Sequence, residues 1–251
     1  MLSFEFLLKK TIIFAVFLTA IIATITYRRY KDSQSWIFMP FLWFTFLIEL
    51  LNLLPTAALF YPEWNFLRLM GHILPDKFIT SSIWVGSLYS IVSFYVYLWY
   101  YRSILRHTKA AKAINVCVVI YSVLVIYSLL NFQDLLVSWL QPHMFAGVVF
   151  TVVAICFYFM TILKSDKILS FYKTLPFWLT FGILFFNLVT MPIFIFAKEL
   201  SFSASVYVYI LVISSYVMYG CFAIGFVVSV KYDRPEEKDN NYGVKQGKTP
   251  F

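Results

Sequence analysis

The sequence predicts an all-α polytopic membrane protein, a bundle of seven transmembrane helices. Of its 251 residues, 61% are hydrophobic and 13% are charged, whereas roughly 25% of the residues of a soluble domain are charged. Charged residues and prolines divide the chain into seven continuously apolar stretches, each near the length of about 20 residues that a helix needs to cross a bilayer. A transmembrane barrel is not expected, because its strands would alternate apolar and polar residues over about 10 positions.

We assign residues 1–230 to one transmembrane domain with short connections between its helices. Helix ends are hardest to place in the second and sixth stretches, because proline rings end or kink a helix, and these stretches contain Pro40, Pro55, Pro176 and Pro192. The expected spans are approximately 11–28, 35–58, 78–101, 113–132, 143–163, 175–197 and 204–230.

The first stretch has a second interpretation, a signal peptide. Lys9 and Lys10 precede it, and cleavage would fall near Ala20 or Ala23, which would leave six spans. We favour a retained span, because the stretch is long enough to cross a bilayer and basic residues follow it at positions 28–31.

The basic residues predict the orientation of the bundle. Over alternate connections, 15 of the 20 Lys and Arg lie on the side of the C-terminal tail and five on the other side. The positive-inside rule therefore predicts an external N-terminus and a cytoplasmic C-terminus in the inner membrane. The net charge of +8 is then explained by the orientation of the chain in the membrane. The expected partner is the lipid bilayer, with an attraction to anionic lipid. No nucleic-acid partner is needed to explain the charge.

The tail, residues 231–251, differs in composition from the rest of the chain. Charged residues, Asn, Gly and Gln replace most of the apolar ones, and Phe251 closes the chain. Such a segment cannot bury enough apolar area to fold alone, so we expect a disordered cytoplasmic tail.

Polar and small residues inside the spans recur at intervals of three and four, which places them on single helix faces. In most of these stripes, close packing and interhelical hydrogen bonds explain the pattern. The stripes are Thr45, Glu49, Asn52 and Thr56 in the second span; Gly86, Ser90, Ser93 and Tyr97 in the third; His143, Gly147, Thr151 and Ala154 in the fifth; Thr180, Asn187 and Thr190 in the sixth; and Ser205, Tyr209, Tyr216 and Tyr219 in the seventh.

Glu49 is the exception, because it is the one acid expected near the middle of a span. An ionised carboxylate at the centre of a bilayer costs about 2.5–3.5 kcal/mol or more. No Lys or Arg lies in the middle of another span, so the expected partners are Asn52, Asn187, tyrosine hydroxyls or a bound cationic ligand. Two roles remain open for Glu49: a ligand, proton or ion site, and a neutral structural hydrogen bond.

From these residues we select candidates for a ligand or proton site and for a hinge. Pro192 is the hinge candidate, because its ring crowds the carbonyl of Leu188 and should kink the sixth helix beside Asn187. Ordinary packing is the alternative for the whole set. The site candidates are Glu49, Asn52, Ser90, Tyr97, Asn187, Tyr209 and Tyr216.

The sequence offers little support for an enzyme. The three histidines form no HExxH motif and no His/Asp cluster, so neither metal hydrolysis nor acyl transfer is favoured. The three cysteines, Cys117, Cys156 and Cys221, lie in apolar stretches without metal-ligand spacing and are expected to be buried free thiols. We expect no catalytic residues, no metal and no cofactor. Residues 204–230 also lack the lysine that a rhodopsin chromophore requires.

Three segments carry a resemblance to known proteins: the most specific is Leu175–Phe186 with the following Met191-Pro192, and the others are Leu47–Leu51 and Ser87–Ile91 with Tyr100–Arg102. They resemble segments of a group of small seven-span membrane proteins that is common in Bacteroidetes. The resemblance covers spans two to seven, and the charged tail departs from it. The group has no assigned activity, but its members are often considered input modules for histidine kinases, so the resemblance implies a sensor.

We therefore expect a non-enzymatic receptor or signal-input subunit with a cavity near Glu49. Because the tail and the short basic loops leave no room for an output domain, the receptor would need a separate output protein such as a membrane-associated kinase. The alternative is a small-solute or ion transporter with its site near Glu49, which would need alternating access and would work by itself. No motif specifies the ligand, the partner or the oligomeric state.

Overall fold

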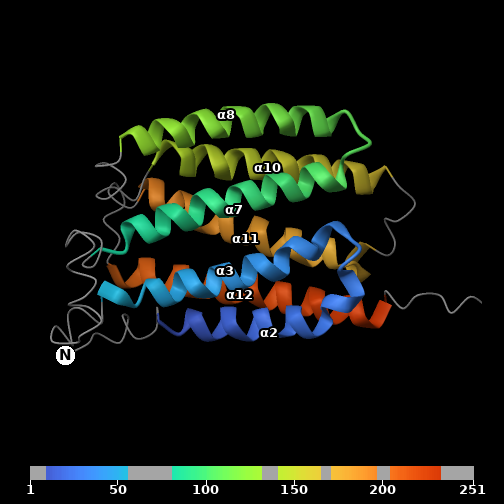
Figure 1. Cartoon of the computed structure of the whole chain (residues 1–251), viewed down its shortest axis with the longest axis horizontal. Coiled ribbons are helices and arrows are strands. Elements are labelled where there is room, and N and C mark those ends of the chain that lie inside the picture. Colours follow the sequence, from blue (N-terminus) through green and yellow to red (C-terminus); the bar gives the residue numbers. More distant parts are fainter. Residues whose placement is uncertain (1–9, 56–80, 132–140, 165–170, 197–203, 233–251) are drawn as a thin grey trace, which may run out of the picture.

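A computed structural model describes residues 10–55, 81–131, 141–164, 171–196 and 204–232. Within these ranges seven α-helices run alternately up and down as one bundle (Figure 1). Each is long and apolar enough to cross a membrane, α3 being counted together with a short 3-10 helix, η1, that precedes it. The chain is therefore a polytopic, all-helical membrane protein, as its composition predicts. The helices are α2 (Ile12–Tyr30), α3 (Phe38–Leu51), α7 (Ile83–Ile104), α8 (Ala110–Leu130), α10 (Pro142–Leu163), α11 (Leu175–Phe196) and α12 (Ala204–Tyr232), with η1 (Gln34–Ile37) and a second 3-10 helix, η3 (Phe171–Lys173).

The second helix is shorter than the expected span 35–58. It ends at Leu51, where the backbone N–H of Asn52 bonds to the carbonyl of Ile48 and the N–H of Leu53 turns back to the carbonyl of Leu50 at 3.0 Å. Glu49 consequently lies in the last turn of α3, whereas the expected span 35–58 places it nearer the middle. Residues 56–80 and 233–251, and with them Thr56 and most of the predicted tail, lie outside the described residues.

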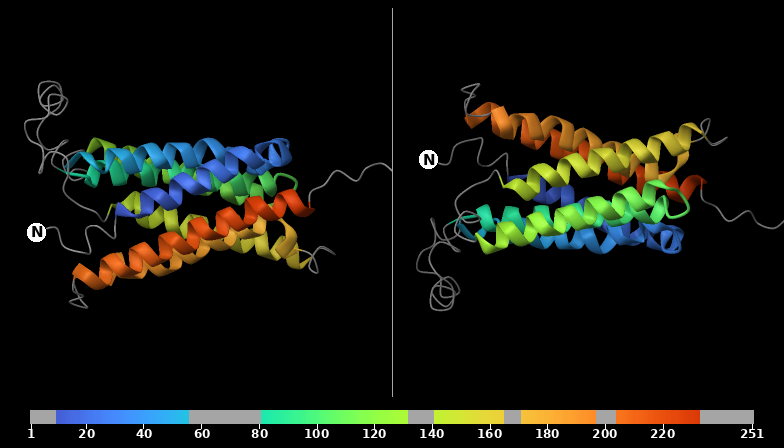
Figure 2. Two further views of the ribbon diagram at one scale, coloured as in Figure 1. Left: turned by 90° about the horizontal axis from the view of Figure 1, so that it is seen from below. Right: turned by 90° about the horizontal axis from the view of Figure 1, so that it is seen from above.

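Helix order around the bundle follows from the contacts between neighbours. α12 packs against α11 and α2, and α2 packs against α3; α7 packs against α8 and α10. Contacts of α3 with α7 and of α10 with α11 join these two groups (Figure 2). The outermost helix is α8, whose Val116, Val119 and Val123 are about 60% exposed. This apolar face is suited to lipid, because no water-exposed globular surface would present such a row.

A cluster of buried aromatic rings packs the half of the bundle in which α2 and α7 end. The ring of Phe38 makes edge-to-face contacts with Tyr100 and Phe222, at centroid distances of 4.9 and 5.6 Å. Tyr100 also shares a hydrogen bond with Ser35 at 3.2 Å, which ties η1 to α7. The phenol of Tyr101 donates to Thr180 of α11 at 3.2 Å. The rings therefore fill volume while their hydroxyls keep partners, as polar atoms in a bilayer require.

Three glycines let helices approach closely, one between α7 and α10 and two between α11 and α12. A Cβ on Gly147 of α10 would lie 2.3 Å from the ring of the buried Phe94 on α7, and one on Gly182 would lie 3.0 Å from the backbone of Met218. Gly225 meets Trp178 in the same way, whereas Gly220 has open space around it. Close approach through small residues is the usual basis of helix association in lipid.

We expect Gly147→Ala to destabilise the bundle, because Phe94 is buried and its ring cannot move away cheaply. Overpacking of this kind costs about 1–3 kcal/mol. The midpoint of thermal unfolding in detergent should fall by several degrees. Gly220→Ala is the matched control and should leave that midpoint unchanged or raise it, since alanine favours the helix. Equal midpoints for the two variants would contradict this account of the α7–α10 crossing.

Candidate functional site

A cavity of about 220 Å³ lies where α2, α7 and α10 begin and where α3 and α11 end. All the described helices except α8 contribute residues to its lining. This convergence places polar groups from distant parts of the chain against one another inside the bundle. The cavity lies toward the end of the bundle at which α2 begins and α3 ends, on the left in Figure 1.

Five of the seven site candidates line this one cavity: Glu49 and Asn52 from α3 and its C-cap, Ser90 and Tyr97 from α7, and Asn187 from α11. In the sequence these residues are up to 138 positions apart. The stripe in the second span and the stripe in the third span thus face each other across the cavity.

Tyr209 and Tyr216 lie outside the cavity. Both are exposed on the side of α12, at 39% and 44%, and the hydroxyl of Tyr216 donates to the carbonyl of Thr11 at 3.3 Å. The cavity face of α12 instead presents Leu211, Ser215 and Tyr219. At about 100° of rotation per residue, Tyr216 lies roughly 100° around the helix axis from the centre of that face. A spacing of seven residues placed Tyr209 and Tyr216 on one stripe but did not show which way the stripe points.

Glu49 lines the cavity together with the phenols of Tyr89, Tyr97 and Tyr219. Tyr89 of α7 and Tyr219 of α12 are close enough to Glu49 for electrostatic interaction, and Tyr89 is within hydrogen-bonding range of Tyr97 and Tyr219. Tyr219 belongs to the seventh-span stripe, whereas Tyr89 is one position away from Ser90 and was missed. Phenol hydroxyls donate and accept, so this group can solvate either protonation state of a carboxyl.

Lys10, which was not among the expected partners of Glu49, also lines the cavity. Its ammonium donates to the backbone carbonyl of Asn52 at 2.7 Å. The cation comes from the beginning of the first span, not from the middle of a span. It reaches the cavity because Glu49 and Asn52 lie at the end of α3, level with the start of α2. The sequence shows no Lys or Arg in the middle of another span, and Lys10 adds a cation to the cavity from the start of a helix.

Several polar residues of the stripes have a structural role. The hydroxyl of Thr190 donates to the carbonyl of Phe186 within α11 at 2.7 Å, and Thr45 bonds to the carbonyl of Phe41 in the same way at 2.9 Å. Thr180 accepts the phenol of Tyr101. Asn187 differs: its amide N–H donates to the carbonyl of Ile183 at 2.8 Å, and that bond leaves its oxygen as an acceptor at the cavity wall.

A buried histidine lies directly behind the cavity. His143 of α10 is fully buried and hydrogen-bonded to Ser128 of α8 through Nδ1 at 3.0 Å and to Ser90 through Nε2 at 3.3 Å. Ser90 also donates to the carbonyl of Ser87 at 2.8 Å. This chain joins three helices and fixes the position of a serine that lines the cavity. In the sequence His143 appeared only as part of a small-residue stripe, and Ser128 gave no signal.

Tyr97 lines the cavity and also packs against the aromatic cluster around Phe38. Its ring stacks on Phe38 at 6.5 Å and meets Phe41 edge to face at 5.7 Å. Phe38, Tyr100 and Phe222 beyond it are fully buried. The packed cluster thus lies between the cavity and the opposite end of the bundle.

The hinge candidate Pro192 lies within α11, which continues to Phe196. Because proline has no N–H, the carbonyl of Leu188 lacks its usual helical donor. Asn187 and Met191, which flank this point, both line the cavity, whereas the side chain of Leu188 is 54% exposed and does not. The weakened turn is therefore next to the cavity, but the freed carbonyl belongs to a residue on another face.

The described residues contain no group of three or more His, Cys, Asp or Glu side chains arranged to hold a metal ion. Cys117, Cys156 and Cys221 are free thiols. Cys221 is buried, as expected, whereas Cys156 is exposed on α10.

Comparison of the chain with protein families, with curated proteins and with solved structures finds no match.

Substitutions of His143 should separate its two hydrogen bonds. His143→Leu removes both and leaves buried serine hydroxyls with fewer partners, so we expect a loss of about 1–3 kcal/mol in the stability of the bundle. His143→Gln can keep a partner for Ser90, and His143→Asn can keep one for Ser128. Both should unfold at temperatures between those of wild type and His143→Leu in the same detergent. If all three variants unfold at the wild-type temperature, the histidine does not join the helices.

Proposed function

We propose that this chain is a non-enzymatic receptor or signal-input subunit of the cytoplasmic membrane that binds a small polar solute in the Glu49 cavity. The observation that supports this most is the convergence of six helices on one enclosed group of polar side chains. Such groups are costly in a bilayer and are usually functional. A site shared by six helices also lets a ligand act on the relative positions of all of them.

The lining favours a small solute with an amine. A volume of about 220 Å³ is below the range of about 300–1,000 Å³ that is typical of sites for drug-sized ligands. The Glu49 carboxyl and the phenol rings of Tyr89, Tyr97 and Tyr219 suit a cation, through charge and cation–π attraction. Lys10 at the same cavity suits an anionic group on the same solute, as in an amino acid.

The orientation that we propose places this cavity at the outer face of the membrane. The positive-inside rule puts the N-terminus outside, and the cavity lies at the end where α2 begins. A receptor in this orientation samples the extracytoplasmic solution. The basic end of the bundle would then face the cytoplasm, where an output protein would dock.

Transmission of the signal is proposed to involve α11 and the aromatic cluster. Asn187 and Met191 touch the cavity beside Pro192, where α11 lacks a backbone hydrogen bond, so this helix can bend at small cost. Tyr97 is in contact with both the cavity and Phe38. A change in ring packing would therefore reach the opposite end. The resemblance to seven-span proteins of Bacteroidetes makes a membrane-associated histidine kinase the proposed output partner.

The second candidate is a transporter, and one observation favours it. The lining extends along α7 as far as Tyr97 and along α12 as far as Tyr219, so it approaches the middle of the bundle, where transporters hold their substrates. Counterflow of radiolabelled amino acids in proteoliposomes distinguishes the two candidates. Exchange of label without a partner protein supports transport, and ligand binding without exchange supports the receptor.

The proposed orientation predicts the location of reporter fusions along the chain. Fusions to a reporter that is active only in the cytoplasm measure it directly. A cytoplasmic signal after residue 75 would reverse the bundle and would place the cavity on the inner side. Fusions after Lys31, Lys109, Lys167 and Lys248 should be cytoplasmic, and fusions after Pro75, Gln133 and Glu199 should be external.

Glu49→Gln should abolish ligand binding while leaving folded protein near the wild-type amount. A neutral amide is easier to place in hydrocarbon than a carboxylate, but it cannot attract an ammonium group. Binding is measured as the rise in unfolding temperature of purified protein with a panel of amino acids and small amines. Asp32→Asn removes one acid at the other end of the bundle and is the matched control.

A second matched pair tests the assignment of the cavity face of α12. Tyr219→Phe should weaken the ligand response, whereas Tyr216→Phe should not, because of these two tyrosines only Tyr219 lines the cavity.

For the Glu49 prediction, the contradicting outcome is a full ligand response in Glu49→Gln. Glu49 would then be a structural group and the proposed site would be wrong.

A further inference from the structure

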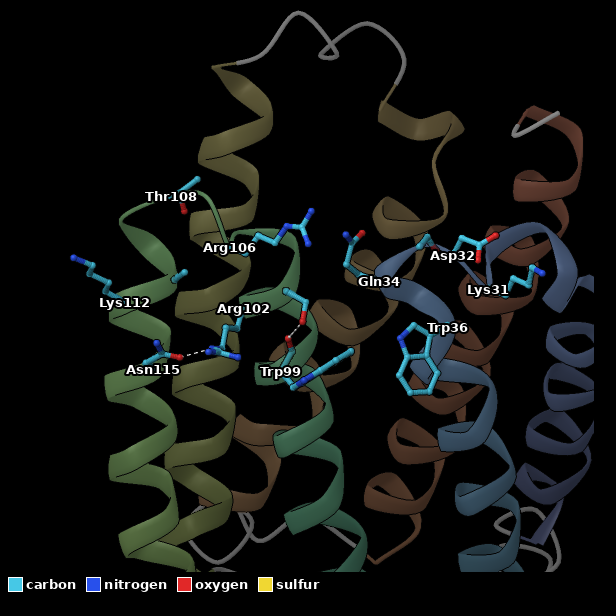
Figure 3. A pocket seen from close by; sticks show the side chains of 13 residues that line it. Lys31, Asp32, Gln34, Trp36, Trp99, Arg102, Arg106, Thr108, Lys112 and Asn115 are labelled. Carbon is cyan, nitrogen blue, oxygen red and sulfur yellow. Dashed lines mark hydrogen bonds between the residues drawn. The ribbon is translucent and has the colours of Figure 1, made fainter. Parts of the chain in front are cut away.

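At the end of the bundle opposite the Glu49 cavity, a second pocket has a different chemistry. It has a volume of about 590 Å³ and lies between η1, the end of α7 and the start of α8 (Figure 3). Four basic residues line it, Lys31, Arg102, Arg106 and Lys112, with one acid, Asp32. Neither the proposed receptor function nor the transporter alternative uses this pocket.

The two arginines form its centre. Figure 3 shows Arg106 extending from the turn after α7 toward Gln34 of η1, while Lys31 and Asp32 lie beside each other at one rim and Lys112 points outward at the other. Nε of Arg102 donates to the side-chain oxygen of Asn115, and Nε of Arg106 donates to His107 at 2.9 Å. In the described part of the chain neither arginine pairs with a carboxylate. Each guanidinium therefore keeps four N–H donors for an anion.

An apolar groove continues directly from this pocket along the membrane-facing side of the bundle. The groove, of about 550 Å³, shares Trp99, Arg102 and Asn115 with the pocket and extends along Val96, Val118 and Val119. Val119 is 64% exposed on the lipid face of α8. A ligand that fills both parts must be anionic at one end and apolar at the other.

The aromatic residues at the junction mark the level of the bilayer surface. Trp36, which is 40% exposed, and Trp99 meet edge to face at 5.9 Å between η1 and α7. Tryptophan is enriched where lipid headgroups meet hydrocarbon. The guanidinium groups are thus at headgroup depth, and the groove runs below them toward the acyl chains.

We propose that this composite pocket is a specific site for an anionic phospholipid. The headgroup phosphate binds Arg102 and Arg106 through charge-assisted hydrogen bonds, Gln34 and Asn115 provide polar contacts beside it, and an acyl chain occupies the groove of Val96, Val118 and Val119. A soluble phosphate compound would leave the groove empty. A lipid in this position bridges η1, α7 and α8 and stabilises their packing at the basic end of the bundle.

The test is native mass spectrometry of the purified full-length chain titrated with phosphatidylglycerol and, separately, with phosphatidylcholine. Wild type should retain phosphatidylglycerol preferentially. Arg102→Gln with Arg106→Gln should lower that affinity by about tenfold or more, because the variant loses both charges that attract the headgroup phosphate. Arg106 donates a hydrogen bond to the exposed His107, so Arg106→Gln alone should fold; it should give part of the loss and covers a failure of the double variant to fold.

The matched control is Arg28→Gln with Arg29→Gln. It removes the same charge at the same end from exposed residues that do not line the pocket, and it should leave the preference intact. An equal loss in this control would mean diffuse surface attraction and would overturn the proposal, as would an unchanged preference in the pocket variants. Glycerol 3-phosphate, which has the phosphate but no chains, should not displace the lipid; displacement would indicate a free-anion site and would also overturn it.

Discussion

Close packing in the absence of a hydrophobic driving force is the constraint on which this structure depends. Lipid tails are as apolar as the helix surfaces, so helices associate through van der Waals contact and through hydrogen bonds between buried polar groups. Van der Waals contact is seen where Gly147 meets Phe94 and in the edge-to-face rings around Phe38. Hydrogen bonding between helices is seen in the chain Ser128–His143–Ser90. Polar residues must therefore face inward, where they define the cavity.

The two ends of the bundle differ in the charged and aromatic residues that line their pockets. One end holds the Glu49 carboxyl, Lys10 and a set of phenols within a small cavity; the other end exposes arginines and lysines beside tryptophans. The aromatic cluster of Phe38, Tyr100 and Phe222 lies between them. A lipid held at the basic end and a solute held at the cavity end would both act on α7, since Tyr97 lines the cavity and Arg102 lies little more than one turn further along this helix. Lipid composition could thus bias the same packing that the solute addresses.

Hydrogen bonds within a helix satisfy many of the polar side chains in the spans. Threonine and serine hydroxyls such as Thr45, Thr190 and Ser214 return a bond to a carbonyl three or four residues earlier. Such a residue is satisfied without a partner on another helix. Asn187 makes a similar bond through its amide N–H, which leaves its side-chain oxygen as an acceptor in the cavity that Glu49 also lines.

The sequence by itself determined the all-helical class, the seven spans and the inward faces of α3 and α7. These follow from run length and three-to-four spacing, which are properties of a single helix. Only the tertiary structure decided how the faces meet. Spacing could not show that Tyr219 points into the cavity while Tyr216 points outward, because that depends on the rotation of α12 against α11 and α2. It also could not bring Lys10 to Glu49, or Lys31 to Arg102 and Arg106, since these neighbours come from ends of different helices whose relative heights are set by packing and by where α3 stops.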